Sequence, residues 1–262
     1  MPTFRPKPND YRITDVKGTK RKLLSASVCD QFNASLLGLG DLTQPASQID
    51  AIAAVFDLEG FTNFSKQIEP HLSVPLFLSE FLPWLMLQLR KEMINEKHSE
   101  GIQLYCSLPF FVKFMGDGLL VLWDSSTMRP VARRNVLVSV SEICETYVDS
   151  FLPMIRQKVA EPPSRLRCGV ARGNVYSVGD GNDFVGSCIN MAARLQKLPG
   201  VTFAFNRRGF DLEDAKVDGF FKTSTLVRKV VIRGIGENEL VAIMQHEFGA
   251  MSAVDKAFYR EP

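Results

Sequence analysis

The chain has 262 residues, a formal net charge of +2 at pH 7 and an apolar fraction of 45%. This length suits one large domain, or one domain with an extension, and the apolar fraction is enough to build a buried core. With so small a net charge, the composition offers no case for nucleic-acid binding. The first 22 residues are locally basic, and such a run is usually a solvated tail.

Residues 1–48 are polar and contain proline, so we expect an N-terminal extension with a short helix around 23–37 and a linker over 38–45. From residue 49 to 250 the pattern alternates between strands and helices, and residues 251–262 form a tail. The expected elements are, in chain order, a strand over 52–56, a helix over 76–95, a hairpin of 110–114 and 119–123, a helix over 131–159, a strand pair of 165–171 and 174–178, a helix over 187–198, and strands over 201–205, 225–232 and 240–245.

The order strand, helix, hairpin, helix, strand is typical of a ferredoxin-like βαββαβ core. The sequence therefore predicts an α/β fold of the α+β kind, in which helices cover a mainly antiparallel sheet.

Cysteine usage and hydropathy narrow the class of protein further. The five cysteines are scattered and form no Cys-x-x-Cys pair, so neither a disulfide framework nor a zinc site is indicated. The start of the chain lacks the apolar stretch of a signal peptide. The most hydrophobic window, 72–89, contains two prolines, a glutamate and a glutamine, which favours an amphipathic helix over a membrane span. We expect a cytoplasmic protein with no membrane or nucleic-acid partner.

Two aspartates each lie where an apolar strand ends, with glycine nearby in the sequence. Asp57 follows the strand over 52–56, and Asp117 lies between two glycines in the hairpin. Each could merely cap a turn, since Asp-Gly is a common hairpin signal. Because the proposed core makes these strands neighbours, the two carboxylates would also converge, and carboxylate oxygens are ligands for hard divalent cations. Such a site suits chemistry on a nucleoside triphosphate.

Two further segments carry polar groups suited to a phosphorylated substrate. Gly60, Phe61 and Thr62 open a helix whose free backbone N–H groups could receive phosphates. Asn190 and Arg194 are four residues apart on a predicted helix and share one face. They could be an ordinary solvated pair, but an amide and a guanidinium one turn apart also suit a ribose and a phosphate.

Together these stretches resemble class III nucleotide cyclases. The family's Asp-x-x-Gly-Phe-Thr is similar to residues 57–62, its Lys-x-x-Gly-Asp to 113–117, and its Gly-x-x-Val-Asn-x-Ala-Ala-Arg-Leu to 186–195, with Ile189 in place of valine. The resemblance covers roughly residues 50–246. Where some relatives have a phosphate-binding arginine, this chain has Asn174.

The resemblance implies a homodimer with composite active sites at its interface. It implies that Asp57, Asp117 and the backbone carbonyl of Leu58 hold two divalent cations, Mn²⁺ or Mg²⁺, which serve the ribose 3′-hydroxyl and the triphosphate. Asn190 and Arg194 would come from the other subunit to orient the ribose and to stabilise charge on the α-phosphoryl group. A basic phosphate contact is often found where this chain has Arg233.

The resemblance places Lys113 and Asp183 at the positions that read the base, and this pair resembles the adenylate cyclases. Lysine only donates hydrogen bonds and a carboxylate only accepts them. Adenine, cytosine and uracil all satisfy such a pair, so the residues alone leave the base open.

As a stand-alone domain with these motifs, the chain also looks like the bacterial pyrimidine cyclases of the Pycsar anti-phage systems. This resemblance implies synthesis of cyclic UMP or cyclic CMP, which activates a cyclic-nucleotide-responsive effector. It favours UTP, with an adenylate cyclase as the alternative. An inactive nucleotide-binding homologue and a two-metal polymerase palm are further alternatives. Retention of Asp57, Asp117, Asn190 and Arg194 together argues against the inactive homologue, and the helix that carries Asn190 and Arg194 argues against the palm.

Overall fold

The computed structural model describes residues 3–16, 18–210 and 223–262. By their contacts the residues form two compact units. The first, here the N-terminal unit, comprises residues 1–48 and 176–185, and the second, here the core unit, comprises residues 49–175 and 186–262. Each unit is described by itself.

The N-terminal unit contains a hairpin and short helical turns rather than the helix expected over 23–37. Strands β1 (Tyr11–Val16) and β2 (Thr19–Leu24) pair antiparallel, and β9 (Asp183–Val185) pairs with the last residues of β8. The helical turns are η1 (Pro8–Asp10), α1 (Ala26–Cys29) and η2 (Ala34–Leu37). The single-helix prediction was wrong because Asn33 caps a new turn through a hydrogen bond from the backbone N–H of Ser35, which divides the segment.

The main sheet of the core unit confirms the predicted α+β fold. Its strands lie in the order β11-β12-β10-β8-β3-β7-β6, and the four strands β8-β3-β7-β6 have the order of a ferredoxin-like core. Strand β8 pairs parallel with β10, whereas β10 with β12, β11 with β12, β3 with β7, and β6 with β7 pair antiparallel. The strands are β3 (Gln48–Glu59), β6 (Phe111–Phe114), β7 (Gly118–Asp124), β8 (Arg165–Val178), β10 (Phe203–Asn206), β11 (Thr225–Ile232) and β12 (Gly236–Met244).

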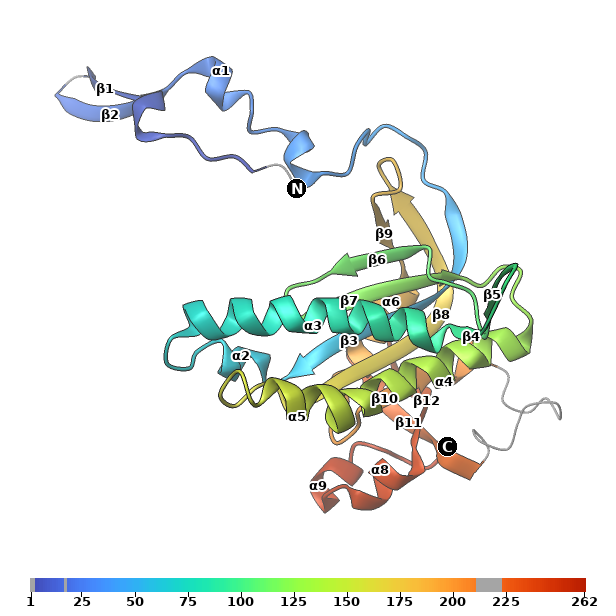
Figure 1. The fold of residues 1–262 in the computed structure, drawn as a ribbon. Helices are drawn as coiled ribbons and strands as arrows, with labels where there is room; N and C mark the ends of the chain where they lie inside the picture. The colour runs from blue at the N-terminus through green and yellow to red at the C-terminus, as the bar shows by residue number, and fades with distance from the viewer. Residues whose placement is uncertain (1–2, 17, 211–222) are drawn as a thin grey trace. The chain divides into compact units, whose positions relative to one another are not determined.

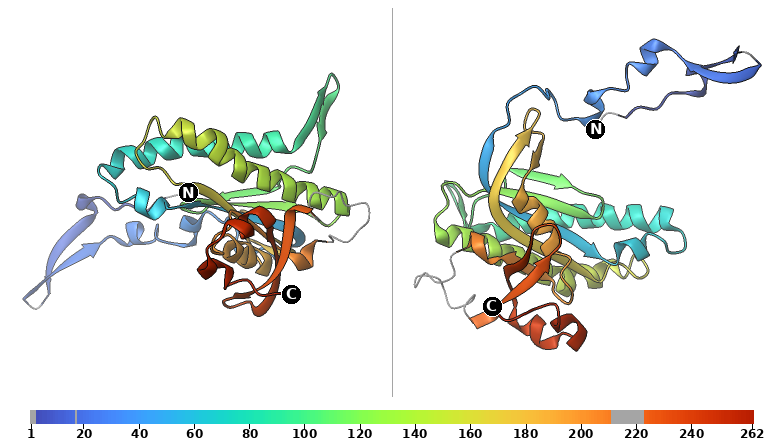
Figure 2. Two further views of the ribbon diagram at one scale, coloured as in Figure 1. Left: turned by 90° about the horizontal axis from the view of Figure 1, so that it is seen from below. Right: turned by 180° about the vertical axis from the view of Figure 1, so that it is seen from behind.

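Helices cover both faces of this sheet, but unequally. The long helices α3 (Pro70–Glu92) and α4 (Pro130–Thr146) lie side by side on one face, and α6 (Ser187–Leu195) lies on the other (Figures 1 and 2). Alternation along β3 explains the layering. Phe56 and Leu58 belong to the main hydrophobic core under α3 and α4, so Asp57 and Glu59 point to the face that carries α6.

Three sequence predictions differ from the structure in detail. The segment predicted as a strand pair over 165–178 is one continuous strand, β8, because residues 172–174 keep an extended conformation instead of turning. The predicted helix over 131–159 is α4 followed by a π-helical turn, η3 (Tyr147–Phe151), and α5 (Leu152–Ile155). A short hairpin of β4 (Ile94–His98) and β5 (Gly101–Leu104) occupies a segment for which no strands were expected.

Helix α3 is the one helix in the described ranges that is long and apolar enough to cross a membrane by length and composition. Its buried side chains recur every four residues at Phe77, Phe81, Leu85 and Leu89, and they belong to the core. This spacing is the amphipathic pattern expected of a helix packed on a sheet.

The core unit also contains short helical elements. The helical turns are α2 (Phe61–Phe64), which follows β3, and η4 (Arg207–Gly209), which follows β10, and the helices α8 (Gln245–Ala250) and α9 (Ala253–Lys256) come after the last strand. Tyr259 is buried after α9, and its hydroxyl donates to the carbonyl oxygen of Pro199 at 2.6 Å.

Candidate active site

The structure brings the two predicted metal-binding aspartates to the same end of adjacent strands. Asp57 on β3 is the register partner of Gly118 on β7, and Asp117 immediately precedes that glycine. The strands approach so closely that a Cβ atom at Gly118 would clash with the carbonyl oxygen of Phe56. Glycine is required at this contact because the backbones of both strands occupy the space that a side chain would need.

The turn before β7 leaves Asp117 accessible. Gly116 adopts a φ of +80°, and the backbone N–H of Met115 donates to the carbonyl of Gly118 at 2.8 Å, which closes the turn. Asp117 is half-buried, and its carboxylate has no side-chain partner among the described residues. The Leu58 side chain is buried in the core, so only the backbone of this residue can act as a ligand.

Asp57, in contrast, is already paired with a cation that the sequence analysis did not single out. Arg167 on β8 donates from Nη2 to Oδ2 of Asp57 at 2.7 Å, and both side chains are mostly buried. Arg165 donates from Nε to Glu59 at 2.5 Å in the same way. The sequence could have revealed these ion pairs. Charged and apolar residues alternate along both strands, which places the acidic residues of one strand and the basic residues of the other on the same face of the sheet.

The donor set at this strand end fits divalent cations in kind. Two carboxylates from adjacent strands and backbone carbonyl oxygens are the ligands that Mg²⁺ and Mn²⁺ prefer. The described residues contain no cluster of three or more His, Cys, Asp and Glu side chains arranged for a metal. A site here would therefore depend on the two aspartates, on backbone oxygens and on oxygens of the substrate.

Gly60, Phe61 and Thr62 lie directly after β3, beside Asp57. Gly60 has a φ of +88° and begins α2, as the sequence predicted. The N–H groups of Asn63 and Phe64 both bond to the carbonyl of Gly60, so the amides of Phe61 and Thr62 are the ones that no helical bond uses. The ring of Phe61 packs against Phe64 and Phe77 and anchors the turn.

The two predicted base-reading residues belong to different units. Lys113 is half-buried on edge strand β6 of the core unit, opposite Leu120 of β7. Asp183 begins β9 in the N-terminal unit, where its Oδ1 accepts a hydrogen bond from the backbone N–H of Phe184 at 2.9 Å. Strand alternation puts Phe111 on the same face of β6 as Lys113.

Helix α6 carries Asn190 and Arg194, and glycines let it pack closely on β8. A Cβ atom at Gly169 would clash with the carbonyl of Ala192 and would lie 2.5 Å from the backbone nitrogen of Gln196. Cys188, Met191, Ala192 and Leu195 face inward and are buried. Asn190 and Arg194 therefore project from the outer side of the helix, toward the turn between β11 and β12.

A cationic hollow of about 470 Å³ lies between α6 and this turn. Arg194, Lys197 and Arg233 line it, and none of the three has a carboxylate partner in the described part of the chain. Its lining residues include no acidic side chain. Three unpaired cations around one open hollow favour a polyanionic ligand. Lys197 is a functional candidate that the sequence analysis missed, although it lies three residues after Arg194 and shares its face. The lining residues are Asn190, Ala193, Arg194, Lys197, Arg233, Gly234 and Ile235.

A second hollow of about 480 Å³ adjoins the first. The two share Asn190, Gly234 and Ile235, so Asn190 lies at their junction. The lining of the second hollow is more varied than that of the first. It includes Arg172, Arg208, Ser187, Asn206 and Glu239.

The core unit thus has two separate polar centres. Asp57, Asp117 and Arg167 lie at the β3–β7–β8 strand ends, whereas neither hollow beside α6 is lined by Asp57 or Asp117. Helix α6 contacts β10 and β11, on the side of β8 away from β3. Within one protomer, the structure brings the aspartates together but does not bring Asn190 and Arg194 to them.

The fold of the chain is similar to that of several solved structures. No protein-family model and no curated protein matches the chain in sequence. The guanylyl cyclase Cya2 matches with a TM-score of 0.56 and 16% identity over 77% of this chain and 94% of its own. The guanylate cyclase domain of RhGC from Catenaria anguillulae, in complex with GTP, matches with a TM-score of 0.51 and 16% identity over 76% and 98%.

A third structure is the catalytic core of a rhodopsin-guanylyl cyclase with converted specificity, in complex with ATPαS. It has a TM-score of 0.53 and 17% identity over 76% of this chain and 98% of its own. The chain has the fold of a class III nucleotide cyclase catalytic domain. At sequence identities of 16–17%, this similarity establishes the fold alone. The chemistry of the site has to be argued from its residues.

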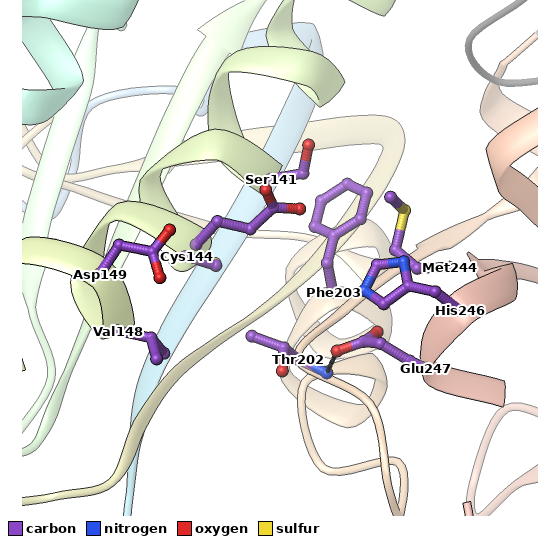
Figure 3. Close-up of a pocket in the computed structure, with 10 residues that line it drawn as sticks. Ser141, Cys144, Val148, Asp149, Thr202, Phe203, Met244, His246 and Glu247 are labelled. Atoms are coloured by element: carbon purple, nitrogen blue, oxygen red, sulfur yellow. Dashed lines mark hydrogen bonds between the residues drawn. The ribbon is translucent and has the colours of Figure 1, made fainter. Parts of the chain in front are cut away.

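The cyclase fold of this chain has another hollow, of about 310 Å³, that contains none of the predicted site residues (Figure 3). Asp149, His246 and Glu247 line it, and Glu247 accepts a hydrogen bond from the backbone N–H of Thr202 at 2.8 Å. Burial, and after it the nearby carboxylate of Glu142, raises the pKa of Glu145 in this lining. The acidic character of this hollow is opposite to that of the cationic one beside α6.

Proposed function

We propose that the chain is a nucleotide cyclase, a phosphorus–oxygen lyase that converts a nucleoside triphosphate to its 3′,5′-cyclic nucleotide and pyrophosphate. The observation that carries this proposal is the pair of complementary centres on a cyclase fold. One centre has two aspartates at adjacent strand ends, one of them paired with Arg167, and the other has an amide and three cations that no described carboxylate pairs with. A triphosphate substrate needs both kinds of chemistry around its reacting phosphorus.

Asp57, Asp117 and the backbone carbonyl of Leu58 would hold two divalent cations, Mn²⁺ or Mg²⁺. Such ions, when bound, polarise phosphoryl oxygens and lower the pKa of a coordinated hydroxyl. The unused amides of Phe61 and Thr62 lie beside this place and would donate to phosphate oxygens. Arg167 would compensate negative charge on the triphosphate from its position against Asp57.

The active protein would be a homodimer with composite sites. The hollows that Asn190 and Arg194 line contain neither aspartate of their own protomer, so a second protomer would complete each site. Asn190 would orient the ribose so that its 3′-oxygen is in line with the α-phosphorus. Arg194 would stabilise charge on the α-phosphoryl oxygens, and its loss should lower the rate about 10²- to 10³-fold. Arg233 and Lys197 would bind the outer phosphates.

For the base, we propose a pyrimidine, with UTP preferred and CTP next. Lys113 would donate to a carbonyl oxygen of uracil or to N3 of cytosine, and Asp183 would accept from N3–H of uracil or from the amine of cytosine. Phe111 shares the strand face of Lys113, and an aromatic ring there leaves less room for a purine. An adenylate cyclase acting on ATP is the second candidate, because adenine satisfies the same donor and acceptor.

In the cell, the product would be a second messenger in anti-phage defence. A cytoplasmic cyclase would release cyclic UMP or cyclic CMP, and a cyclic-nucleotide-responsive effector would bind it. This part of the proposal rests on the resemblance to the Pycsar pyrimidine cyclases.

Incubation of the purified protein with UTP, CTP, ATP and GTP separately, each with Mn²⁺, tests the proposal. We expect pyrophosphate and a cyclic nucleotide from UTP, and neither from an Asp117→Asn variant of the same fold. Cyclic AMP as the sole product would overturn the pyrimidine assignment in favour of the adenylate cyclase. Nucleotide binding without pyrophosphate from any substrate would indicate an inactive nucleotide-binding homologue.

A further inference from the structure

One buried carboxylate has no role in the chemistry described so far. Glu239 lies on β12 and exposes only 7% of its surface, yet no described residue donates a hydrogen bond or ion pair to its side chain. The residue is buried as a whole, but its carboxylate oxygens remain open to the adjacent hollow. A carboxylate that no protein group pairs with is available to a donor from a ligand.

The strand pattern shows where this carboxylate points. Glu239, Val241 and Ile243 alternate with Ala242 and Met244, which belong to the main core. Val241 and Ile243 are completely buried on the opposite face of β12. Glu239 continues this row at the end nearest the turn and lines the hollow of about 480 Å³ beside α6.

A second buried polar side chain faces the same hollow. Asn206 on β10 exposes 6% of its surface and is the register partner of Val241, so it lies on the same face of the sheet. Its Oδ1 accepts a hydrogen bond from the backbone N–H of Arg208 at 3.0 Å, which leaves its amide N–H groups directed elsewhere. The hollow therefore combines a buried acceptor with a buried donor.

The charges in this lining do not neutralise Glu239. Arg172 is committed to Asp50 through an ion pair and to Ser125 Oγ through a hydrogen bond of 2.9 Å. Arg208 is exposed and forms no ion pair within the described ranges. An O–H or N–H donor from a ligand would satisfy the carboxylate without changing this network.

The neighbouring hollow indicates what such a ligand is. Phosphates would lie among Arg194, Lys197 and Arg233, and Asn190 lines both hollows. In a nucleoside triphosphate, the group next to the phosphates is the ribose. Its hydroxyls are donors, and acidic side chains accept from ribose 2′-hydroxyls in other nucleotide-binding folds.

We propose that Glu239 accepts a hydrogen bond from the ribose 2′-hydroxyl of the substrate and so makes the site selective for ribonucleotides over 2′-deoxyribonucleotides. This inference rests on the proposed function. It adds a specificity residue from β12, on the same protomer as Asn190, and assigns the second hollow to the sugar.

The test compares UTP with dUTP, and ATP with dATP, by kcat/KM with Mn²⁺ and by equilibrium dissociation constants from calorimetry. We expect the wild type to prefer the ribonucleotide, and Glu239→Ala to lose about 10- to 100-fold of that preference through weaker ribonucleotide binding. Glu239→Gln keeps an acceptor oxygen and should therefore retain part of the preference for the ribonucleotide. Glu237→Ala is the matched control, since Glu237 is an exposed carboxylate two residues away.

Thermal stability provides an independent readout. Because no described residue pairs with the Glu239 carboxylate, Glu239→Ala should have a melting temperature close to that of the wild type, whereas loss of a structural contact would lower it. An unchanged ratio of ribonucleotide to deoxyribonucleotide affinity in Glu239→Ala would overturn the inference. Failure of the wild type to convert any triphosphate would overturn the proposed function instead, and the dissociation constants would still decide the role of Glu239.

Discussion

Arg167 and Asp57 form an ion pair across the β8–β3 boundary, with Nη2 of the arginine 2.7 Å from Oδ2 of the aspartate. Nη1 of Arg167 also lies 3.6 Å from Oε1 of Glu59, so one guanidinium pairs with two carboxylates on the same face of β3. A fixed cation at this place both orients Asp57 and supplies positive charge where a triphosphate would bind.

Substitution of this arginine should affect catalysis more than folding. In Arg167→Met the apolar stem remains and the charge is lost, and we expect kcat/KM to fall about 10²-fold or more. Arg167→Lys should recover part of the activity because it restores charge without the two-pronged geometry. Steady-state kinetics and circular dichroism check this prediction. A lower melting temperature with unchanged kcat/KM would show that the pair is only structural.

Mixing two inactive variants should restore activity if the sites are composite. Asp57→Ala removes a carboxylate from one centre, and Arg194→Ala removes the guanidinium from the other. Random pairing of equal amounts makes half of the dimers mixed, and each mixed dimer has one intact site, so about a quarter of wild-type activity should return. Asp57→Ala mixed with Asp117→Ala is the control, because no pairing of these two variants completes a site. Confirmed mixed dimers without activity would contradict the composite arrangement.

Lys197 should contribute to substrate binding through charge. We expect Lys197→Ala to raise KM severalfold with little change in kcat, since the lysine would bind outer phosphates in both the ground state and the transition state. The effect should shrink as ionic strength rises. Lys91→Ala is the control, because Lys91 is an exposed cation on α3. Equal KM values for the two variants at low salt would remove Lys197 from the site.

The close approach of α6 to β8 should be sensitive to a single methyl group. In Gly169→Ala the added Cβ would clash with the carbonyl of Ala192 and displace the helix that carries Asn190 and Arg194. We expect a lower melting temperature and a loss of cyclase activity. Gly249→Ala is the matched control, because a Cβ there meets no atom within 4 Å. Wild-type kinetics in Gly169→Ala would show that α6 tolerates displacement.

The cysteines should differ sharply in reactivity. Cys29 is exposed, whereas the other four are buried, and burial raises the pKa of Cys106 and of Cys188 to about 11 from 9.0. We expect a disulfide reagent at pH 8 to label one thiol rapidly in the native protein and five in urea, and none rapidly in native Cys29→Ser. A second rapidly labelled thiol in the native protein would contradict this burial.

The same two thiols predict a pH dependence of stability. Because the folded state raises both pKa values above 9.0, their neutral forms stabilise the fold fully below pH 9. This contribution is lost as the pH rises from about 9 toward 11. Urea midpoints at pH 8 and pH 10.5 measure the loss, which should be smaller in a Cys106→Ala variant.

The sequence by itself determined the order of elements and the strand-end positions of the aspartates. The hairpin of 110–114 and 119–123 and the βαββαβ core followed from apolar runs and turn residues, which are local signals. Asn190 and Arg194 shared a helix face through their spacing alone. The helix predicted over 23–37 and the break in β8 were wrong because side-chain capping and sheet pairing decide such boundaries.

Only the tertiary structure decided which distant residues meet. Arg167 reaches Asp57 across 110 positions of sequence. Glu239 of β12 and Asn190 of α6 line the same hollow, although 49 positions of sequence separate them. The hydrophobic periodicity of the sequence predicts the face of a strand or helix on which a side chain lies. It does not predict which other element packs against that face. The separation of the aspartates from Asn190 and Arg194 likewise follows from strand order, which sets lateral distance across a sheet independently of sequence distance.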